Sequence, residues 1–167
     1  MQLNSTTLPQ TISITAIASI SPLGNEIETI WKNYNTDKTC FEERFLDQKN
    51  TLVASLDSDS KQIVDALQQS DIKYKFLDKS VLYAMAASRK AIQNAGWTSN
   101  DVFGINIGSS RGATDLFEKH YKDYLETGKA QTLASPTTTL GNISSWVAHD
   151  LQSCGPEISH SITCSTA

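Results

Sequence analysis

The sequence has few arginines and no cluster of basic residues. It contains three Arg, which are scattered, and its 18 Asp and Glu outnumber its 14 Lys and Arg, giving a formal net charge of -4. Neutralising nucleic-acid phosphates requires clustered Lys and Arg. We therefore expect neither nucleic acid nor an anionic membrane surface among the partners of this chain.

Long apolar runs are also missing. No stretch of 18 apolar residues occurs, and the first apolar stretch, residues 12–20, is interrupted by Ser and Thr and follows no basic segment. This pattern predicts neither a signal peptide nor a membrane span.

Cysteine is scarce, with an odd count of three and no CxxC spacing. That usage predicts neither a disulfide framework nor a metal site, and it favours a reducing cytoplasm. Cys40 and Cys154 lie in a polar stretch and at a helix end, so we expect structural or incidental roles for both.

What is present is the composition of an ordinary globular chain. Hydrophobic residues make up 39% and charged residues 19%, and there is no repeat, linker or Pro- or Gly-rich tract. One domain spanning residues 1–167 is the expected organisation.

The order of elements predicts an α/β architecture. Residues 11–20 are rich in β-branched side chains and predict a buried strand, followed by a turn at Pro22–Gly24 and a helix after Asn25. Residues 36–60 carry no sustained period and predict a surface hairpin or loop. Further helices are predicted at 60–70, 78–95, 116–127 and 140–151, further strands at 102–108 and 157–164, and a loop at 134–142. Strands separated by helices indicate a parallel sheet.

Cys164 stands at the end of the last predicted strand, where parallel α/β proteins place their chemistry. A following helix N-terminus would lower the pKa of its thiol, and backbone N–H groups of the same turn could hold an oxyanion. The competing interpretation is a buried cysteine that acts as a small apolar filler.

No histidine is an evident proton-transfer partner for this cysteine. His160 shares a strand face with Cys164, but four residues of extended strand separate the two by about 13 Å. We therefore expect a packed or interfacial role for His160, and helix-surface positions for His120 and His149. The glycine-rich segment 104–112 lacks both GxGxxG and a Walker lysine, so nucleotide binding is not indicated.

Four segments in order resemble the N-terminal part of the β-ketoacyl-[acyl-carrier-protein] synthases, condensing enzymes of the thiolase superfamily. They are ITAIASISPLG, DKSVLYAMAASRKAIQNAGW, FGINIGSSRG and CGPEISHSITCSTA. The last is similar to the family's Gly-Pro, strand and cysteine elbow, although Thr163 stands where Ala is usual. The resemblance implies the thiolase-like layered α/β/α/β/α fold, of which residues 1–167 would be most of the N-terminal half, incomplete at the C-terminus.

The resemblance also implies a function. Cys164 would be the acyl-accepting nucleophile, with its own N–H in the oxyanion hole, in a decarboxylating condensation with a malonyl thioester. The implied partner is acyl carrier protein bearing phosphopantetheine-bound acyl and malonyl groups, in cytoplasmic fatty-acid or polyketide-like chain extension, with no cofactor and no metal. A homodimer, or a heterodimer with a related subunit, is expected.

Two further residues match family positions. Asn142 matches an Asn before the family's interface helix, and Arg111 falls where a turn residue shapes the far end of the acyl pocket, so both are candidate substrate-binding residues. Arg111 replaces a small or apolar residue, so an interface salt bridge is its alternative role.

The family's two catalytic histidines, its lysine and its HGT-type motif are expected after residue 167. The segment alone is therefore expected to be inactive and to represent less than half of a subunit, requiring a continuation or a second chain. A retained cysteine argues against the noncatalytic chain-length factors. Alternative functions are a cysteine-dependent acyltransferase without condensation and a noncatalytic dimerisation partner.

Overall fold

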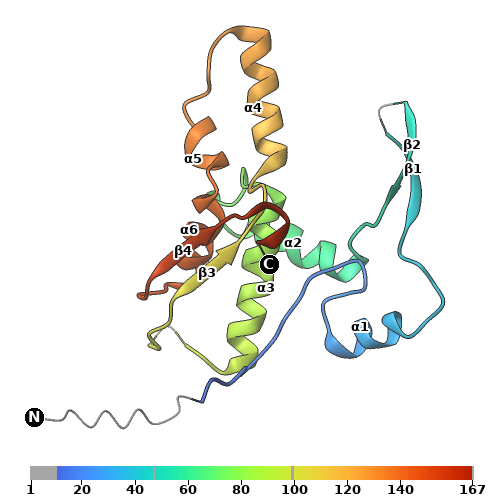
Figure 1. The fold of residues 1–167 in the computed structure, drawn as a ribbon, viewed down its shortest axis with the longest axis vertical. Coiled ribbons are helices and arrows are strands. Elements are labelled where there is room, and N and C mark those ends of the chain that lie inside the picture. The colour runs from blue at the N-terminus through green and yellow to red at the C-terminus, as the bar shows by residue number, and fades with distance from the viewer. Residues whose placement is uncertain (1–10, 47, 99, 167) are drawn as a thin grey trace, which may run out of the picture.

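A computed structural model describes residues 11–46, 48–98 and 100–166 of the chain (Figure 1). Its helices are α1 (Ile27–Tyr34), α2 (Ser58–Ser70), α3 (Lys79–Ala95), α4 (Thr114–Thr127), α5 (Ala134–Thr138) and α6 (Gly141–Leu151). Its strands are β1 (Glu42–Leu46), β2 (Lys49–Val53), β3 (Ile105–Gly108) and β4 (Glu157–His160).

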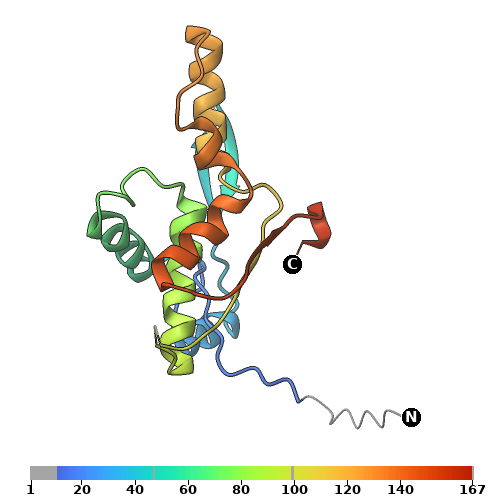
Figure 2. The same cartoon turned by 90° about the vertical axis from the view of Figure 1, so that its left-hand side faces the viewer.

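The core forms where α3 packs against α2 and α6, and α6 packs in turn against β3 and β4. Figure 2 shows α6 between α3 and the two strands. Val81, Leu82 and Met85 of α3 and Val147 of α6 are fully buried at this junction. Burial of these side chains supplies the main hydrophobic stabilisation of the fold.

Local signals set both ends of α3, as the sequence predicts. The Asp78 carboxylate accepts a hydrogen bond from the Ser80 N–H at 2.9 Å, and Gly96 ends the helix in the left-handed conformation with φ 70°. A carboxylate at the N-cap and a glycine just after the last turn satisfy backbone groups that the helix itself cannot.

Strands β3 and β4 pair in parallel, with Ile105 opposite Glu157 and Gly108 opposite His160. The predicted parallel pairing of these two segments is confirmed, but both strands are shorter than predicted. β3 starts three residues later than expected, and β4 ends at His160 rather than at Cys164. The chain leaves the strand there because it turns into a single 3-10 turn over Thr163–Ser165.

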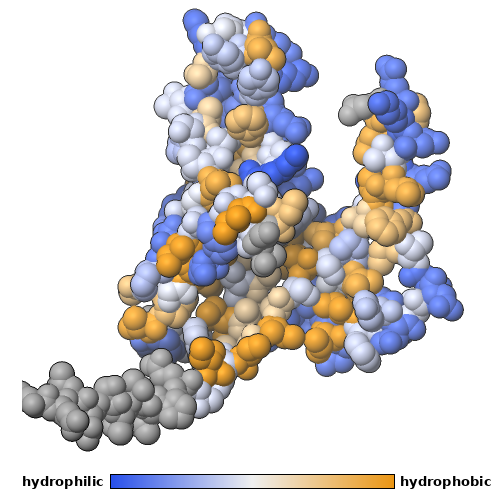
Figure 3. Space-filling model, viewed as in Figure 1, coloured by the Kyte–Doolittle hydropathy of each residue, from blue (hydrophilic) through white to orange (hydrophobic). Residues whose placement is uncertain are grey.

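The prediction of a buried strand at residues 11–20 is wrong. These residues form no regular element, and Ile12 and Ile14 are 93% and 85% exposed. A strand needs a neighbouring backbone to complete its ladder, and within the described residues none is paired with this segment. It runs instead beside α3, where Asn94 Nδ2 donates to the Ile17 carbonyl at 3.4 Å. Figure 3 shows apolar side chains exposed along this part of the surface.

The hairpin β1–β2 agrees with the sequence prediction, whereas the segment around α5 does not. The hairpin predicted within 36–60 is confirmed, since β1 and β2 pair antiparallel. The loop predicted at 134–142 instead contains the short helix α5, in which the hydroxyls of Thr137 and Thr138 donate to carbonyls four residues earlier, each at 2.6 Å. Together α4 and α5 project from the body of the molecule (Figure 1).

Across residues 11–46, 48–98 and 100–166, no helix combines the length and apolarity that crossing a membrane requires.

Candidate active site

Cys164 lies in the 3-10 turn Thr163–Ser165, four residues after the end of β4. Its thiol is free and the residue is exposed. A solvent-exposed position does not fit the alternative of a buried apolar filler. The cysteine therefore stands beyond the carboxyl ends of two parallel strands, the edge where α/β proteins assemble their sites.

The residue before the cysteine has an unfavourable backbone conformation. Thr163 has φ 49°, in the left-handed region. For a β-branched residue this conformation is a true outlier, and such strain persists only where surrounding contacts hold it. Strained residues of this kind occur preferentially at functional sites.

Hydrogen bonds on both sides of Cys164 stabilise the strained conformation of Thr163. The Thr166 hydroxyl accepts from the Ile162 N–H at 2.8 Å and donates to the Thr163 carbonyl at 2.6 Å, which closes the turn on itself. The Ser110 hydroxyl donates to the same Thr163 carbonyl at 2.8 Å, which ties the turn to the segment after β3.

His160 is half-buried and hydrogen-bonded, as the prediction of a packed histidine requires. Its Nε2 lies 2.9 Å from the Thr166 carbonyl oxygen and its Nδ1 lies 3.1 Å from Asn106 Oδ1. The estimate of about 13 Å between His160 and Cys164 assumed a continuous strand. That assumption is wrong because the chain folds back after His160. Among the described residues, no hydrogen bond joins His160 to Cys164.

Arg111 lies on the turn between β3 and α4 and is exposed. It borders a shallow hollow of about 300 Å³ together with Thr114, Phe117 and Glu118. In the described part of the chain Arg111 forms no ion pair. Its neighbour Ser110 reaches the cysteine turn, so the structure brings the Arg111 segment beside Cys164.

Asn142 is buried in the first turn of α6. Its side-chain Nδ2 donates to the Pro136 carbonyl at 2.9 Å, and its backbone N–H donates to the Thr139 carbonyl at 3.0 Å. These bonds hold α5 against the start of α6. The Asn142 amide is thus engaged by the α5 backbone, and no hydrogen bond within the described residues links it to the cysteine turn.

The remaining histidines differ from each other. His149 is exposed on α6, as predicted. His120 lies on α4, as predicted, but it is half-buried: its Nδ1 is buried without a partner among the described residues and its Nε2 lies 3.4 Å from the Thr137 hydroxyl. α5 folds back over α4 at this point, and the sequence predicted a loop there.

The two other cysteines have only weak local contacts. Cys40 Sγ donates to the Pro22 carbonyl at 3.6 Å and Cys154 Sγ donates to the Gln152 carbonyl at 3.7 Å. Over the ranges 11–46, 48–98 and 100–166, no group of three or more His, Cys, Asp or Glu side chains could hold a metal ion.

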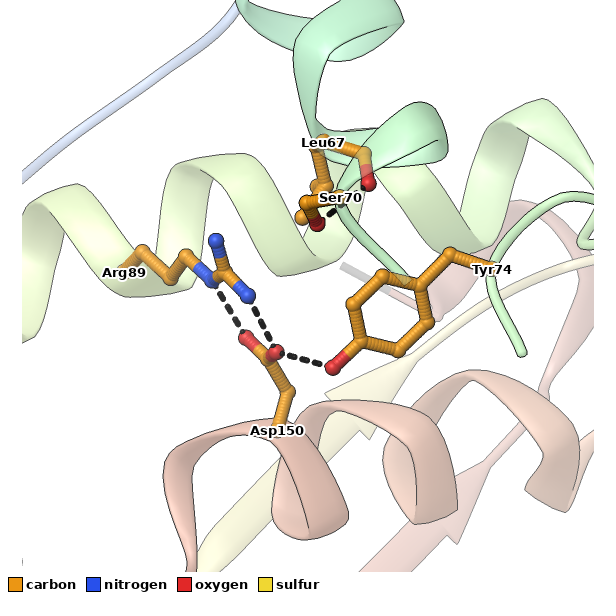
Figure 4. Close-up of polar contacts among 5 residues, drawn as sticks. All are labelled: Leu67, Ser70, Tyr74, Arg89 and Asp150. Atoms are coloured by element: carbon orange, nitrogen blue, oxygen red, sulfur yellow. Dashed lines mark hydrogen bonds and ion pairs between the residues drawn. The ribbon is translucent and has the colours of Figure 1, made fainter. Parts of the chain in front are cut away.

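A polar cluster around the buried side chain of Asp150 was not predicted from the sequence. Arg89 Nε and Nη2 donate to the two oxygens of Asp150 at 2.7 and 2.6 Å, and the Tyr74 hydroxyl donates to the same carboxylate at 2.8 Å (Figure 4). Nearby, the Ser70 hydroxyl closes the end of α2 by donating to the Leu67 carbonyl at 2.7 Å.

This cluster ties α3 and the segment after α2 to α6. The Asp150 side chain is 1% exposed, so its charge depends on these donors. Burial, followed by the hydrogen bond to Asp150, raises the pKa of Tyr74, and the hydrogen bond to Asp150 raises the pKa of Arg89. The three residues are far apart in sequence and follow no spacing rule that could have identified them.

Comparison with protein families finds one match over most of the chain. The family described as "Beta-ketoacyl synthase, N-terminal domain" matches residues 10–167. Among curated proteins, the 3-oxoacyl-[acyl-carrier-protein] synthase 2 of Coxiella burnetii is 24% identical over 161 residues. The protein of the same name from Staphylococcus aureus strain COL is 24% identical over 163 residues. Each alignment covers 93% of this chain and 39% of the relative, so the chain spans well under half the length of these proteins.

Two solved structures are similar in fold. The ishigamide ketosynthase/chain length factor has a TM-score of 0.66 at 17% identity, over 89% of this chain and 39% of its own. A beta-ketoacyl synthase from Burkholderia phymatum STM815 has a TM-score of 0.61 at 16% identity, over 87% and 38%. The layered α/β fold predicted from the sequence is thereby confirmed.

Proposed function

The chain belongs to the β-ketoacyl synthase family, and on that premise we propose that Cys164 is the nucleophile of a decarboxylating condensation in fatty-acid or polyketide-like chain extension. The substrates are an acyl group and a malonyl group, each carried as a thioester on acyl carrier protein. The names of the curated relatives support both the reaction and this carrier.

The chemistry proceeds in two steps. Cys164 Sγ attacks the carbonyl carbon of the acyl thioester, and the carrier's phosphopantetheine thiol leaves, which forms an acyl-Cys164 thioester. The malonyl thioester then loses CO₂, its C2 carbon attacks the acyl carbonyl, and the Cys164 thiolate leaves. In both steps the Cys164 N–H is proposed to donate to the oxyanion that develops on the acyl oxygen.

One observation supports this proposal most strongly. The family match extends to a free cysteine that is exposed on a strained turn, past the carboxyl ends of two parallel strands. A nucleophile must be reached by a carrier-bound substrate, and a fixed turn keeps its reacting atom in one place.

The other candidate residues are given roles that fit their surroundings. We propose that Arg111 shapes the far end of the acyl pocket, because it borders the hollow beside Phe117 and its segment is bonded to the cysteine turn. Asn142 contributes by holding α5 on α6 through the Pro136 carbonyl. Assembly as a homodimer, or as a heterodimer with a related subunit, and a cytoplasmic location are part of the same proposal.

A cysteine-dependent acyltransferase of the same superfamily is the second candidate. A free and exposed Cys164 is sufficient for acyl transfer without condensation, so this observation supports the second candidate as well. The family's decarboxylation step uses histidines, so we propose that residues 1–167 alone do not condense substrates.

Intact-mass spectrometry after incubation with an acyl-[acyl-carrier-protein] thioester tests the proposal. The protein gains the mass of one acyl group, and Cys164→Ala does not. Cys154→Ala removes another exposed thiol and serves as the matched control, which keeps the adduct. An adduct that persists in Cys164→Ala, or none in the unaltered protein, refutes the proposal. Supplying malonyl carrier to the full-length protein then separates the two candidates, because only a condensing enzyme releases CO₂.

A further inference from the structure

His160 and Gly108 lie opposite each other in the parallel pair β3–β4. The His160 carbonyl accepts a hydrogen bond from the Ser109 N–H at 3.1 Å, so its backbone is fixed to the end of β3. Asn106 lies two residues before Gly108 and therefore shares its face of the sheet. The imidazole of His160 is bonded to Asn106 on this face.

Gly108 leaves room for a second contact of the same ring. A Cβ atom at this position would lie 2.5 Å from the Thr166 carbonyl oxygen and 3.0 Å from His160 Nε2. The space that a side chain would fill is therefore the place where the histidine ring meets the Thr166 carbonyl, at 2.9 Å. Thr166 is 6% exposed and His160 is half-buried, so the contact is partly shielded from water.

Thr166 also determines the shape of the turn that carries Cys164. Its hydroxyl bonds both the Ile162 N–H and the Thr163 carbonyl. The His160 ring contacts the carbonyl of the same residue. Thr166 is therefore fixed through its side chain, which bonds within the turn, and through its carbonyl, which contacts His160. Through Thr166, His160 opposes relaxation of the strained Thr163 backbone.

We propose that His160 is a positioning residue for the Cys164 turn, acting through an Nε2–H donated to the Thr166 carbonyl. A carbonyl oxygen can only accept, so Nε2 must carry the proton. Nδ1 of this tautomer is an acceptor, so it bonds Asn106 when the amide is turned to present its Nδ2 in place of Oδ1, which exchanges two atoms of nearly equal size. With Nδ1 accepting from Asn106 and Nε2 donating to Thr166, both ring nitrogens are occupied. His160 therefore does not serve as the base that deprotonates the thiol. An effect of His160 on acylation rests on the proposed function of Cys164. The contact between His160 and Thr166 does not depend on that function.

The first test is the protonation site of His160, read from ¹⁵N-edited NMR spectra of the imidazole rings in the protein. The spectrum of His160 is expected to show a proton on Nε2, and His160→Gln identifies its signals by their loss. A ring protonated on Nδ1 alone overturns the proposal. The protonation site itself is read in the unaltered protein, and the variant serves only to assign the signals.

The second test compares two amide variants that differ by one methylene. His160→Gln places an N–H donor close to the position of Nε2, whereas His160→Asn is too short to reach Thr166. Hydrogen exchange at the Ile162 amide is expected to be about tenfold faster in His160→Asn, and within about twofold of the unaltered rate in His160→Gln. His149→Gln, on exposed α6 surface, is the control. Equal exchange rates of the Ile162 amide in His160→Gln and His160→Asn refute the positioning role of His160.

The two proposals can fail separately. Neither NMR nor hydrogen exchange uses a substrate, so an Nε2 proton and a protected Ile162 amide support the positioning role even if Cys164 accepts no acyl group. Acylation of Cys164 at equal rates in the Gln and Asn variants would instead leave the nucleophile established and remove the positioning role.

Discussion

The Ser110 hydroxyl donates a hydrogen bond of 2.8 Å to the Thr163 carbonyl, across 53 residues of sequence. It joins the turn after β3 to the turn that carries Cys164. The position of the cysteine thus depends on two segments that meet at the carboxyl end of the β3–β4 pair.

Ser110→Ala removes the donor and leaves the Thr163 carbonyl with only the Thr166 hydroxyl. Losing one hydrogen bond costs about 1 kcal/mol, so we expect the turn to leave its reactive geometry more often, acylation of Cys164 to slow by about fivefold, and the free energy of unfolding to fall by about 1 kcal/mol. Stopped-flow or quenched acylation kinetics measure the rate. Ser58→Ala is the control, because that hydroxyl contacts only Asp59 on exposed α2 surface. A rate equal to that of the control contradicts the role given to Ser110.

Gly108→Ala places a Cβ atom 2.5 Å from the Thr166 carbonyl oxygen. Backbone must move to relieve this contact, so the cysteine turn shifts and acylation is expected to fall by more than tenfold, on the scale of a misplaced reacting group. Gly141→Ala is the matched control, because nothing lies within 4 Å of its added Cβ and the position is helical. Unchanged acylation in Gly108→Ala would show that the turn tolerates displacement.

Asp150→Ala removes the shared acceptor of Arg89 and Tyr74. The buried hydroxyl of Tyr74 and one end of the guanidinium lose their partner, so the free energy of unfolding is expected to fall by about 2–3 kcal/mol. Urea denaturation measures the change. Glu126→Gln disrupts only an exposed pair with Lys122 at 3.9 Å and should cost less than about 0.5 kcal/mol. Equal losses in the two variants would mean that the cluster in Figure 4 is not a stabilising element.

The same cluster predicts a loss of stability in alkali. Burial and the hydrogen bond to Asp150 raise the pKa of Tyr74 above its ordinary value of 10.0. A raised pKa means that the folded state holds the proton more tightly, so this contribution is complete below pH 10 and is lost as the pH rises through the folded-state value. Urea denaturation at pH 8 and at pH 11 should show a smaller alkaline loss in Tyr74→Phe. An equal loss in both proteins contradicts this linkage.

Local sequence signals predicted the helices well. Asp78 and Gly96 mark the ends of α3 because capping depends on residues adjacent to the helix. The strand expected at residues 11–20 did not form, because its composition fits a strand but strand formation depends on a distant partner. The length of β4 was overestimated because the residue types at Ser161–Thr163 do not predict the left-handed backbone conformation that Thr163 adopts.

The candidate site could be predicted only in part. Cys164 was identified by its place at the end of a predicted strand and by the segment CGPEISHSITCSTA, both of which are local. The bond from His160 to Thr166 was missed because it depends on the chain reversing after β4. The Asp150 cluster was missed because Arg89 and Tyr74 are 61 and 76 positions from it in sequence.

The most direct test of the account is the location of the acyl group within the protein. Trypsin leaves Cys154 and Cys164 in one peptide, because no Lys or Arg follows Lys129 up to Ala167. Cleavage after Glu157 separates them, so a peptide beginning at Ile158 contains Cys164 and no other cysteine up to Ala167. After incubation with an acyl-[acyl-carrier-protein] thioester, mass spectrometry should find the acyl group on this peptide and not on those with Cys40 or Cys154. An acyl group on Cys154, or an unmodified Ile158 peptide, would contradict the assignment of Cys164 as the nucleophile.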